Sequence, residues 1–349
     1  MSAIWDLPDF DGHESVHIFE DRQTGLRAVI ALHSTHLGPA AGGTRFWHYS
    51  DSQAAITDAL RLSRGMSYKN AMAGLPLGGG KGVVLANSSR TKTPEMLAAF
   101  GRAIESLGGR YVTAEDVGMT DDDMVTISGQ TRHVSGLPVT DGRAAGGDPG
   151  PFTARGVYLG IKAAAKHRLG VDSMAGVHVA VQGIGSVGGG VARLLAADGA
   201  KLTLADPDRA KLETMATETG GTAVGLAEIM TVQADLFSPN ALGAILTEES
   251  IAALNVAIVA GGANNQMATP ADAQRLHDRG ILYAPDYVIN AGGIINVGLE
   301  YLGDVSVDEV NARIDMIPDR LHHIWAQSEA ENEPAAIVAD KMAQRLIGR

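Results

Sequence analysis

Two lysines and one acidic residue are the strongest candidates for chemistry. Lys69 stands in Gly65-Met66-Ser67-Tyr68-Lys69-Asn70, Lys81 in Gly78-Gly79-Gly80-Lys81-Gly82, and Asp116 in Thr113-Ala114-Glu115-Asp116-Val117-Gly118. Two amines held near one another disfavour each other's charge, and partial burial adds to this effect, so one of them can be neutral and act as a base. The other stays charged and can hold a carboxylate, while Asp116 can exchange protons with an amino group or with ammonia.

The glycines around Lys81 argue that this segment is special. Glycine destabilises any regular element, so four glycines around one lysine indicate that some group must approach the backbone closely. The plainer interpretation is that Lys69 and Lys81 are surface cations and that Asp116 is a turn residue, because lysines are mostly solvated. Residue types alone leave both interpretations open.

A second glycine-rich segment has the context of a dinucleotide site. Gly183-Ile184-Gly185-Ser186-Val187-Gly188 directly follows an expected strand and opens an apolar helix, so a pyrophosphate can lie at the free N–H groups of the helix N-terminus. Asp206 ends the next expected strand, 206 − 183 = 23 residues after the first glycine. A carboxylate there can bond the adenosine ribose and repel a 2′-phosphate, which favours NAD over NADP.

This glycine-rich segment is also compatible with two different roles. The glycines can serve only to pack a helix on a strand, with Asp206 capping a turn before Pro207. A flavin is the second dinucleotide to consider, but flavin sites usually begin near the start of a chain. The combined pattern favours a nicotinamide cofactor.

The elements that must position these residues are mixed in the first part of the chain. Leu26 to His33 is rich in strand-forming residues, a helix begins at Ser52 and runs into the Lys69 segment, and Thr93-Pro94-Glu95 opens a helix that closes at Gly108-Gly109. From Val177 onward short strands alternate with helices, which is typical of a parallel sheet. The expected strands are Val177 to Val181, Lys201 to Ala205, Val256 to Ala260, Ile281 to Tyr283 and Tyr287 to Ile289.

These elements predict an α/β fold with two domains and the active site in the cleft between them. Residues 1–140 form a mixed α/β domain and residues 141–324 a Rossmann domain, because residues 139–150 are rich in Gly, Asp and Pro and have the composition of an interdomain crossing. A helical tail, about 307–349, is broken at Pro318 and Pro334, and its helices from about residue 325 are expected to pack back on the first domain.

Composition limits the class of protein. A chain of 349 residues exceeds the usual size of one hydrophobic core. Lys and Arg total 28 against 40 for Asp and Glu, a net charge of −12, which argues against nucleic acid or an anionic membrane as partner. There is no cysteine, which excludes disulfides, thiol catalysis and Cys-ligated metals, and no metal site is expected. No targeting segment or apolar stretch of roughly 18 residues is seen, so a cytoplasmic location is expected.

Several motifs together resemble the amino-acid dehydrogenase family of the glutamate, leucine, phenylalanine and valine enzymes, and most of all its leucine, valine and phenylalanine branch. The resemblance covers nearly the whole chain. Its motifs are Gly42-Gly43-Thr44-Arg45, Met66-Ser67-Tyr68-Lys69-Asn70, Gly79-Gly80-Lys81, Thr113-Ala114-Glu115-Asp116-Val117-Gly118, Ala263-Asn264-Asn265-Gln266, and Tyr283-Ala284-Pro285-Asp286-Tyr287-Val288-Ile289-Asn290-Ala291-Gly292-Gly293.

The resemblance implies NAD-dependent, reversible oxidative deamination of an L-amino acid to a 2-oxo acid and ammonia, on a first domain that binds substrate and mediates oligomerisation. It implies that Lys81 activates the water that attacks the imino-acid carbon, that Asp116 shuttles protons, and that Lys69 binds the substrate carboxylate. Residues matched to substrate contacts are Gly42 and Asn265. Residues matched to cofactor contacts are Thr153, Arg45, Asn264 and Asn240, the last standing where many relatives carry cysteine.

The same resemblance indicates an apolar, branched-chain or aromatic substrate. The positions that line the side-chain pocket in leucine dehydrogenases are Ala41, Ala114, Ile294 and Val297 here, all apolar and without a cation for an acidic substrate. Ala41 stands where those enzymes carry leucine and widens the pocket, whereas Ile294 replaces a valine and narrows it. A methylene contributes only ~1–3 kcal/mol of discrimination, so the preferred amino acid stays open.

Two hypotheses from different classes stand beside this one. A non-catalytic NAD-binding sensor or partner subunit on the same scaffold would keep the glycine fingerprint and Asp206, but it would have no need of Lys69, Lys81 and Asp116 together. A 2-hydroxy-acid dehydrogenase normally pairs a histidine with a carboxylate and an arginine, and the histidines here are better explained as solvated or structural residues. A homo-oligomer, from dimer to octamer, is expected from the resemblance.

Overall fold

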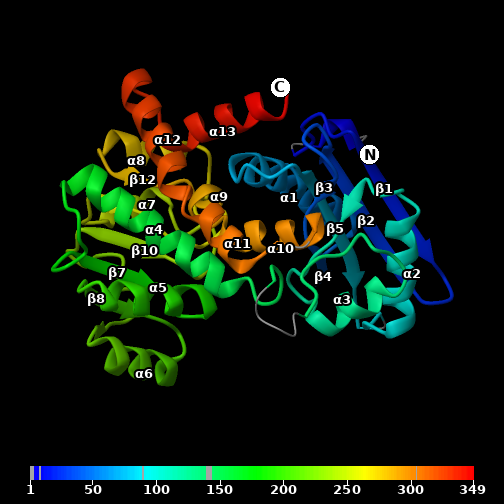
Figure 1. Ribbon diagram of the computed structural model, residues 1–349, viewed down its shortest axis with the longest axis horizontal. Helices are drawn as coiled ribbons and strands as arrows, with labels where there is room; N and C mark the ends of the chain where they lie inside the picture. Colours follow the sequence, from blue (N-terminus) through cyan, green and yellow to red (C-terminus); the bar gives the residue numbers. More distant parts are fainter. Residues whose placement is uncertain (1–3, 8, 89, 139–143, 304) are drawn as a thin grey trace. The chain divides into compact units, whose positions relative to one another are not determined.

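The computed structural model describes residues 4–7, 9–88, 90–138, 144–303 and 305–349. These form two compact units, which are coloured by sequence in Figure 1. Unit 1 comprises Met1–Asp148, Ile294–Val310 and Ala343–Arg349, and unit 2 comprises Pro149–Gly293 and Asn311–Met342. Each unit has a six-stranded sheet covered by helices, which confirms the predicted α/β class.

The sheet of unit 1 places Lys81 at its centre. Its strands run in the order β1-β2-β5-β3-β6, and β4 also pairs with β5. Lys81 is the fourth residue of β5 and lies opposite Ala31 of β2. The expected strand from Leu26 to His33 is confirmed as β2. The strands are β1 Ser15–Asp21, β2 Leu26–Ser34, β3 Ala40–Ala41, β4 Thr44–His48, β5 Gly78–Ala86 and β6 Tyr111–Val112.

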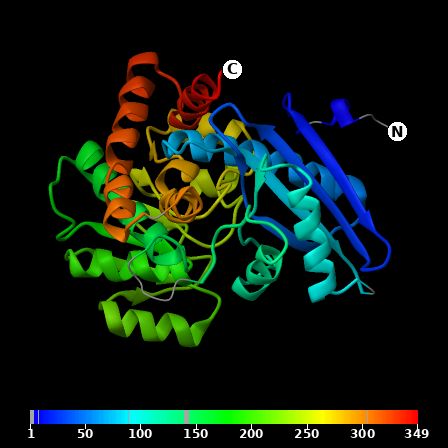
Figure 2. The ribbon, with the colours of Figure 1, turned by 45° about the vertical axis from the view of Figure 1, so that its right-hand side comes forward.

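Helices cover the two faces of this sheet (Figure 2). One apolar cluster joins Ala59 and Leu60 of α1 to Val83 of β5, and the other joins Phe100 of α2 to the next residue of β5, Val84. Because successive residues of a strand face opposite sides, α1 and α2 lie on opposite faces. The helices are η1 Ile4–Asp6, α1 Ser52–Met72, α2 Pro94–Glu105, α3 Asp121–Ser128 and α10 Gly292–Leu302.

The starts of these helices agree with their local sequence signals. The Thr93 hydroxyl caps α2 by accepting from the Met96 N–H, with Pro94 at the first position, and α1 contains the whole Lys69 segment as predicted. Helix α2 ends at Glu105, earlier than the predicted Gly108-Gly109, whose positive φ angles of 61° and 82° belong to the following turn.

Unit 2 has the parallel sheet that the sequence predicted. The strand order is β12-β11-β10-β7-β8-β9, so that the first strand of the unit lies centrally and the chain winds outward in both directions. This is the strand order of a Rossmann fold. The strands are β7 His178–Gln182, β8 Lys201–Ala205, β9 Thr222–Ala223, β10 Leu236–Pro239, β11 Ile258–Val259 and β12 Leu282–Tyr283. The helices are α4 Gly150–Leu169, α5 Ser186–Ala197, α6 Arg209–Thr219, α7 Glu248–Ala253, α8 Ala271–Asp278, α9 Asp286–Ile289, α11 Val307–Ile314, α12 Ile317–Glu331 and α13 Ala335–Leu346. Of these, α11 and α13 belong to unit 2 only in part, because the unit boundaries fall within them.

One strand prediction in unit 2 was wrong. Tyr287 to Ile289 belongs to the short helix α9, in which the Asn290 N–H donates to the Asp286 carbonyl and the Val288 N–H to the Pro285 carbonyl. A short apolar run carries too little periodicity to distinguish strand from helix. The predicted breaks of the tail are confirmed, because Pro318 lies in the first turn of α12 and Pro334 directly precedes α13.

The units divide the chain differently from the predicted domain bounds. Helix α10 falls largely in unit 1, where Asn296 exchanges hydrogen bonds with the backbone of Gly146 and the Glu300 carboxylate accepts from the backbone N–H of Gly136. Most of the tail falls in unit 2, where the buried Trp325 donates to the Tyr283 carbonyl. The predicted crossing lies partly outside the described residues, at 139–143.

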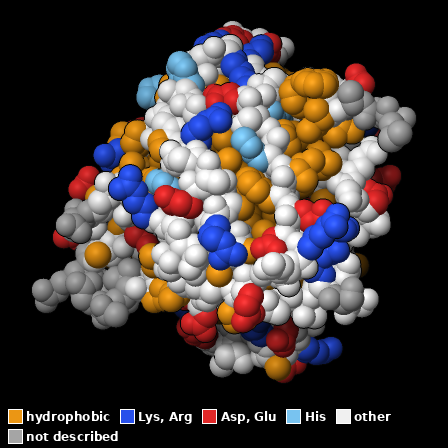
Figure 3. All heavy atoms as spheres, turned by 90° about the vertical axis from the view of Figure 1, so that its right-hand side faces the viewer, with side chains coloured by type: hydrophobic (Ala, Val, Ile, Leu, Met, Phe, Trp, Pro, Cys, Tyr) orange, Lys and Arg blue, Asp and Glu red, His pale blue; other side chains and the backbone are white. Residues whose placement is uncertain are grey.

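Two surface observations bear on partners. No helix within the described ranges is long and apolar enough to cross a membrane. On the face in Figure 3, blue basic and red acidic side chains are interspersed among the described residues. That face offers mixed charge rather than a continuous basic surface for a phosphate backbone.

Candidate active site

The glycines of β5 bring α1 and Tyr111 directly against the strand that carries Lys81. A Cβ on Gly79 would lie 2.0 Å from the Ser67 nitrogen of α1, and one on Gly80 would lie 2.8 Å from the Tyr111 ring. Both distances are far below van der Waals contact. The glycines therefore permit close packing of the protein on itself, and this packing buries Lys81, which is 5% exposed.

Lys81 forms an ion pair with Asp116. The Lys81 Nζ lies 2.5 Å from Asp116 Oδ2, and only 7% of the lysine side chain is exposed. Burial lowers the pKa of Lys81, the charge of Arg45 lowers it further, and Asp116 opposes both. Burial alone would raise the pKa of Asp116, but the charges of Lys81 and Arg45 outweigh it and bring the pKa to about 2. The pair thus combines an ionised carboxylate, Asp116, with an amine, Lys81, that loses its proton at lower pH than an ordinary lysine does.

Arg45 belongs to the same cluster. It lies on β4, and its Nε donates to Asp116 Oδ2 over 3.0 Å while its terminal Nη1 donates to Asp58 Oδ2 over 2.9 Å. The family resemblance assigned Arg45 to the cofactor, and that contact stays a prediction. What the structure shows is an arginine between two carboxylates.

Lys69 lies near the end of α1, on the helix that contacts β5 through Ser67 and Gly79. It is half-buried. The two lysines therefore come from directly packed elements. Their mutual effect on charge remains a prediction, because the established causes of the lowered pKa of Lys81 are burial first and Arg45 after it.

The residues predicted to line the side-chain pocket all belong to unit 1. Ala41 ends β3 and is buried, Ala114 is half-buried, and Val297 of α10 is 8% exposed. Ile294 lies one turn before Val297 on the same helix. Gly42 follows β3, where a Cβ would lie 1.9 Å from the Gly80 carbonyl oxygen, so this glycine lets the two strands approach.

In unit 2 the glycine fingerprint follows β7 directly and runs into the first turn of α5. Gly183 has φ +83°, and a Cβ on Gly188 would lie 1.9 Å from the Gly183 carbonyl oxygen, so these two glycines serve the tight turn. Apart from its neighbours in the chain, no atom of the described residues lies within 4 Å of a Cβ placed on Gly185. The Ile184 N–H donates to Asp206 Oδ2 over 2.9 Å, which ties the loop to the end of β8.

The predicted amide and hydroxyl residues belong to the same unit. Asn240 follows β10 and its Oδ1 accepts from the Gly262 N–H over 2.8 Å. Asn264 and Asn265 are exposed, and Asn265 has φ +52°, a left-handed conformation that asparagine tolerates better than most residues. The hydroxyl of Thr153, in the first turn of α4, donates to the Pro149 carbonyl over 2.9 Å.

Comparison with known proteins decides the family. Residues 13–133 match the model of the Glu/Leu/Phe/Val dehydrogenase dimerisation domain, and residues 204–345 match that of the Glutamate/Leucine/Phenylalanine/Valine dehydrogenase. The chain belongs to the Glu/Leu/Phe/Val dehydrogenase family. The resemblance stated from the motifs is confirmed, and with it the class of enzyme, an amino-acid oxidoreductase.

Individual members of the family are similar over nearly their whole length. The leucine dehydrogenase of Geobacillus stearothermophilus is 45% identical over 96% of this chain and 90% of its own. The valine dehydrogenase of Streptomyces albus is 43% identical over 97% and 93%. The crystal structure of L-tryptophan dehydrogenase from Nostoc punctiforme superposes with a TM-score of 0.85 at 41% identity, covering 96% of both chains. A hetero-hexameric glutamate dehydrogenase of Thermus thermophilus, at 21% identity and a TM-score of 0.76, shares the fold.

Two residues of this family member were not predicted from the sequence. The first is Asp58, which accepts a hydrogen bond from Arg45. Its spacing from Lys69 could have identified it, because residues 11 apart lie on the same face of a helix such as α1. Asn290 is buried and donates to Asn264 Oδ1 over 2.8 Å, while its own Oδ1 has no hydrogen-bond partner among the described residues. Asn290 stands inside one of the motifs that carry the resemblance. Its polar side chain within that largely apolar motif was the signal that could have identified it.

Proposed function

We propose that this family member catalyses the NAD-dependent, reversible oxidative deamination of an apolar L-amino acid to its 2-oxo acid and ammonia. The observation that carries the proposal is the buried Lys81 in contact with the ionised Asp116, in a chain that keeps the family's motifs. Relatives named leucine and valine dehydrogenases support it, as does the tryptophan dehydrogenase structure.

The residues of unit 1 would supply the acid–base chemistry. Lys81, once neutral, can remove a proton from the water that attacks the imine carbon, because burial lowers its pKa and Asp116 receives its hydrogen bond. Asp116 can exchange protons with the substrate nitrogen. Lys69 can hold the substrate carboxylate by charge. A nicotinamide cofactor, when bound, would supply the hydride acceptor.

The pocket residues support an apolar side chain. Ala41, Ala114, Ile294 and Val297 offer no charged or hydrogen-bonding group, so an acidic side chain placed among them would lose its hydration without gaining a partner. Branched-chain and aromatic amino acids remain the candidates, because Ala41 widens the pocket and Ile294 narrows it.

Features of unit 2 fit a dinucleotide. The open space at Gly185 lies at the N-terminus of α5, where the free N–H groups of a helix can bind a pyrophosphate. The Oδ1 of Asn290 is a buried acceptor for which the described part of the chain offers no donor, and it lies beside Asn264 and close to Gly262. Asp206 would bond a ribose hydroxyl and repel a 2′-phosphate, which supports NAD rather than NADP. Subunit number and location in the cytoplasm stay predictions.

The decisive experiment is a panel of L-amino acids with NAD and, separately, with NADP, followed by the absorbance of the reduced cofactor. We expect turnover of branched-chain or aromatic amino acids with NAD and little with glutamate. Lys81→Met, which keeps an apolar chain of similar length, should lower kcat by about 10²–10⁴-fold while NAD binding by titration is retained. Wild-type turnover in that variant would overturn the role of Lys81. If the wild-type protein binds NAD but turns over no amino acid, it is a non-catalytic NAD-binding protein instead.

A further inference from the structure

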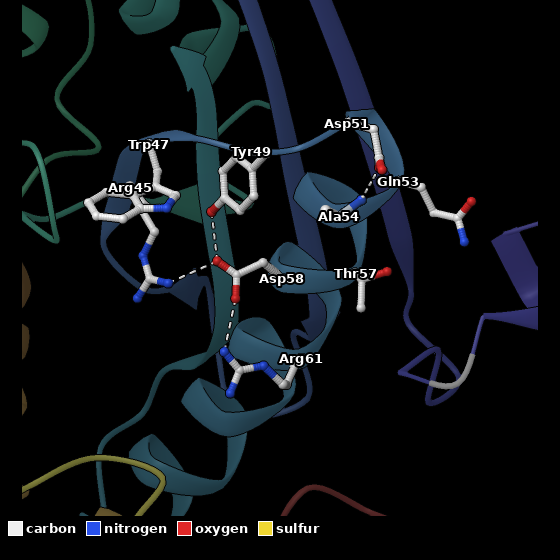
Figure 4. A pocket seen from close by; sticks show the side chains of 9 residues that line it. All are labelled: Arg45, Trp47, Tyr49, Asp51, Gln53, Ala54, Thr57, Asp58 and Arg61. Atoms are coloured by element: carbon white, nitrogen blue, oxygen red, sulfur yellow. Dashed lines mark hydrogen bonds and ion pairs between the residues drawn. The ribbon is translucent and has the colours of Figure 1, made fainter. Parts of the chain in front are cut away.

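A chain of charged side chains runs from the surface of α1 to the Lys81–Asp116 pair. Figure 4 shows its outer part, where Asp58 of α1 receives hydrogen bonds from Arg45, Tyr49 and Arg61 around an open hollow of about 660 Å³. Asp58 Oδ2 lies 2.9 Å from Arg45 Nη1 and 2.6 Å from the Tyr49 hydroxyl, and Asp58 Oδ1 lies 2.9 Å from Arg61 Nη2. Asp58 is thus held by donors from two directions, β4 with its following turn and α1 itself.

The groups around Asp58 favour its ionised form. Its side chain is 14% exposed, and burial alone would raise its pKa. The hydrogen bonds from Tyr49 and Arg61 and the charge of Arg45 outweigh burial, so the pKa of Asp58 is lowered instead. A carboxylate that stays charged can hold an arginine in one orientation through a charge-assisted hydrogen bond.

Arg45 connects Asp58 to the Lys81–Asp116 pair, because its guanidinium donates to both carboxylates. Its Nε donates to Asp116 Oδ2, the same oxygen atom that receives Lys81 Nζ. If Lys81 becomes neutral to act as a base, Asp116 loses one of its two cations and keeps the other. A guanidinium does not lose its proton in proteins, so Arg45 stays charged through such a cycle.

We propose that Arg45, clamped by Asp58, is a positioning residue that orients Asp116 and favours the neutral form of Lys81. This proposal rests on the proposed function, in which Lys81 is the base. Arg45 and Asp58 act in opposite directions on Lys81, because a nearby cation disfavours the charged amine and a nearby anion favours it. Both effects are present in the folded protein, where Arg45 lowers the pKa of Lys81 and Asp58 raises it.

The remaining ionisable groups on the surrounding elements contact the cluster differently. Asp116 follows β6 and pairs with Lys81 directly, and Lys69 lies on the same helix as Asp58 and Arg61. Tyr49 and Arg61 act through Asp58, while the ring of Tyr111 lies against Gly80. Among these groups, Arg45 alone stands between two carboxylates.

The test compares the pH profiles of kcat/KM for Arg45→Gln and Asp58→Asn with that of the wild type. Deamination rises with pH as Lys81 loses its proton. Arg45→Gln removes a cation, so the rising limb should move to higher pH and kcat/KM near neutral pH should fall on the order of tenfold. Asp58→Asn removes the negative charge but keeps a side-chain oxygen that can accept from Arg45, so Arg45 stays in place and the limb should move to lower pH. Arg27→Gln is the matched control, since Arg27 forms an exposed ion pair with Glu20 in the same unit and should leave the profile in place.

A second readout is independent of turnover. The side-chain resonances of Lys81 in isotope-labelled protein, assigned by their loss in Lys81→Met, report its protonation as pH is changed. We expect the Lys81 titration to move up in Arg45→Gln and down in Asp58→Asn. Shifts in the same direction, or no shift in either variant, would overturn the proposal even if the enzyme is active. If the Lys81 titration shifts in opposite directions in the two variants but the wild-type protein turns over no amino acid, the roles of Arg45 and Asp58 are supported. Only the proposed function is then rejected.

Discussion

Two glycine-rich segments look alike in the sequence and differ in the structure. In Gly78-Gly79-Gly80-Lys81-Gly82, a Cβ on any of the four glycines would collide with the protein's own atoms, from 1.9 to 2.8 Å away. In Gly183-Ile184-Gly185-Ser186-Val187-Gly188, the first and last glycines are also internally crowded, but a Cβ on Gly185 would meet nothing within 4 Å. Glycine marks close approach in both segments.

The difference lies in what approaches. At β5 it is the backbone of α1 at Gly79, the ring of Tyr111 at Gly80, and atoms of the neighbouring strands β2 and β4 at the other two glycines. This packing buries Lys81. At the start of α5 the space at Gly185 is open, which suits a bound dinucleotide. The first segment sets the electrostatics of a side chain, and the second leaves room for a ligand.

The largest expected effect is at Gly79. In Gly79→Ala the added methyl group would meet the Ser67 nitrogen and the Ser63 carbonyl oxygen of α1, which are backbone atoms that cannot turn aside. We expect a loss of about 3 kcal/mol or more in the free energy of unfolding, measured by urea denaturation. An unchanged denaturation midpoint would show that α1 does not depend on this contact.

A smaller and different effect is expected at Gly185. Gly185→Ala has no internal clash, so stability should be unchanged or raised by less than about 1 kcal/mol. Because the methyl group would enter the space assigned to the pyrophosphate, the KM for NAD should rise about tenfold or more, measured at saturating amino acid. If Gly185→Ala also loses stability, Gly185 is packed against the protein itself, as the glycines of β5 are, and the contrast between the two segments is wrong.

The smallest effect sharpens the comparison at a third glycine. Gly65 lies inside α1, four residues before Lys69, and a Cβ there would meet nothing within 4 Å. Gly65→Ala should raise the free energy of unfolding by about 0.5–1 kcal/mol, because glycine is a poor helix former, and should leave the KM for the amino acid unchanged. An increase in that KM would assign the space at Gly65 to the substrate, in the way that the space at Gly185 is assigned to the cofactor.

Much of the fold and site could be predicted because the signals are local. Only one helix and one strand separate the glycine turn of the fingerprint from Asp206, and the Rossmann strand order follows from alternating strands and helices. The strand prediction for Tyr287 to Ile289 was wrong because three apolar residues are too few to show a period. The backbone hydrogen bonds of α9 show that they are helical.

By itself, the sequence determined the family, the α/β class and the candidates Lys81, Lys69 and Asp116, because these are carried by residue types in short motifs. Only the tertiary structure decided what surrounds Lys81. Arg45 and Asp58 are 13 residues apart and Arg45 and Asp116 are 71 apart, yet one guanidinium bonds both carboxylates. Pairing of β4 with β5 and packing of α1 on β5 bring them together. Such long-range pairing leaves no period or spacing in the sequence, so the glycines around Lys81 could indicate close approach but not name the neighbours.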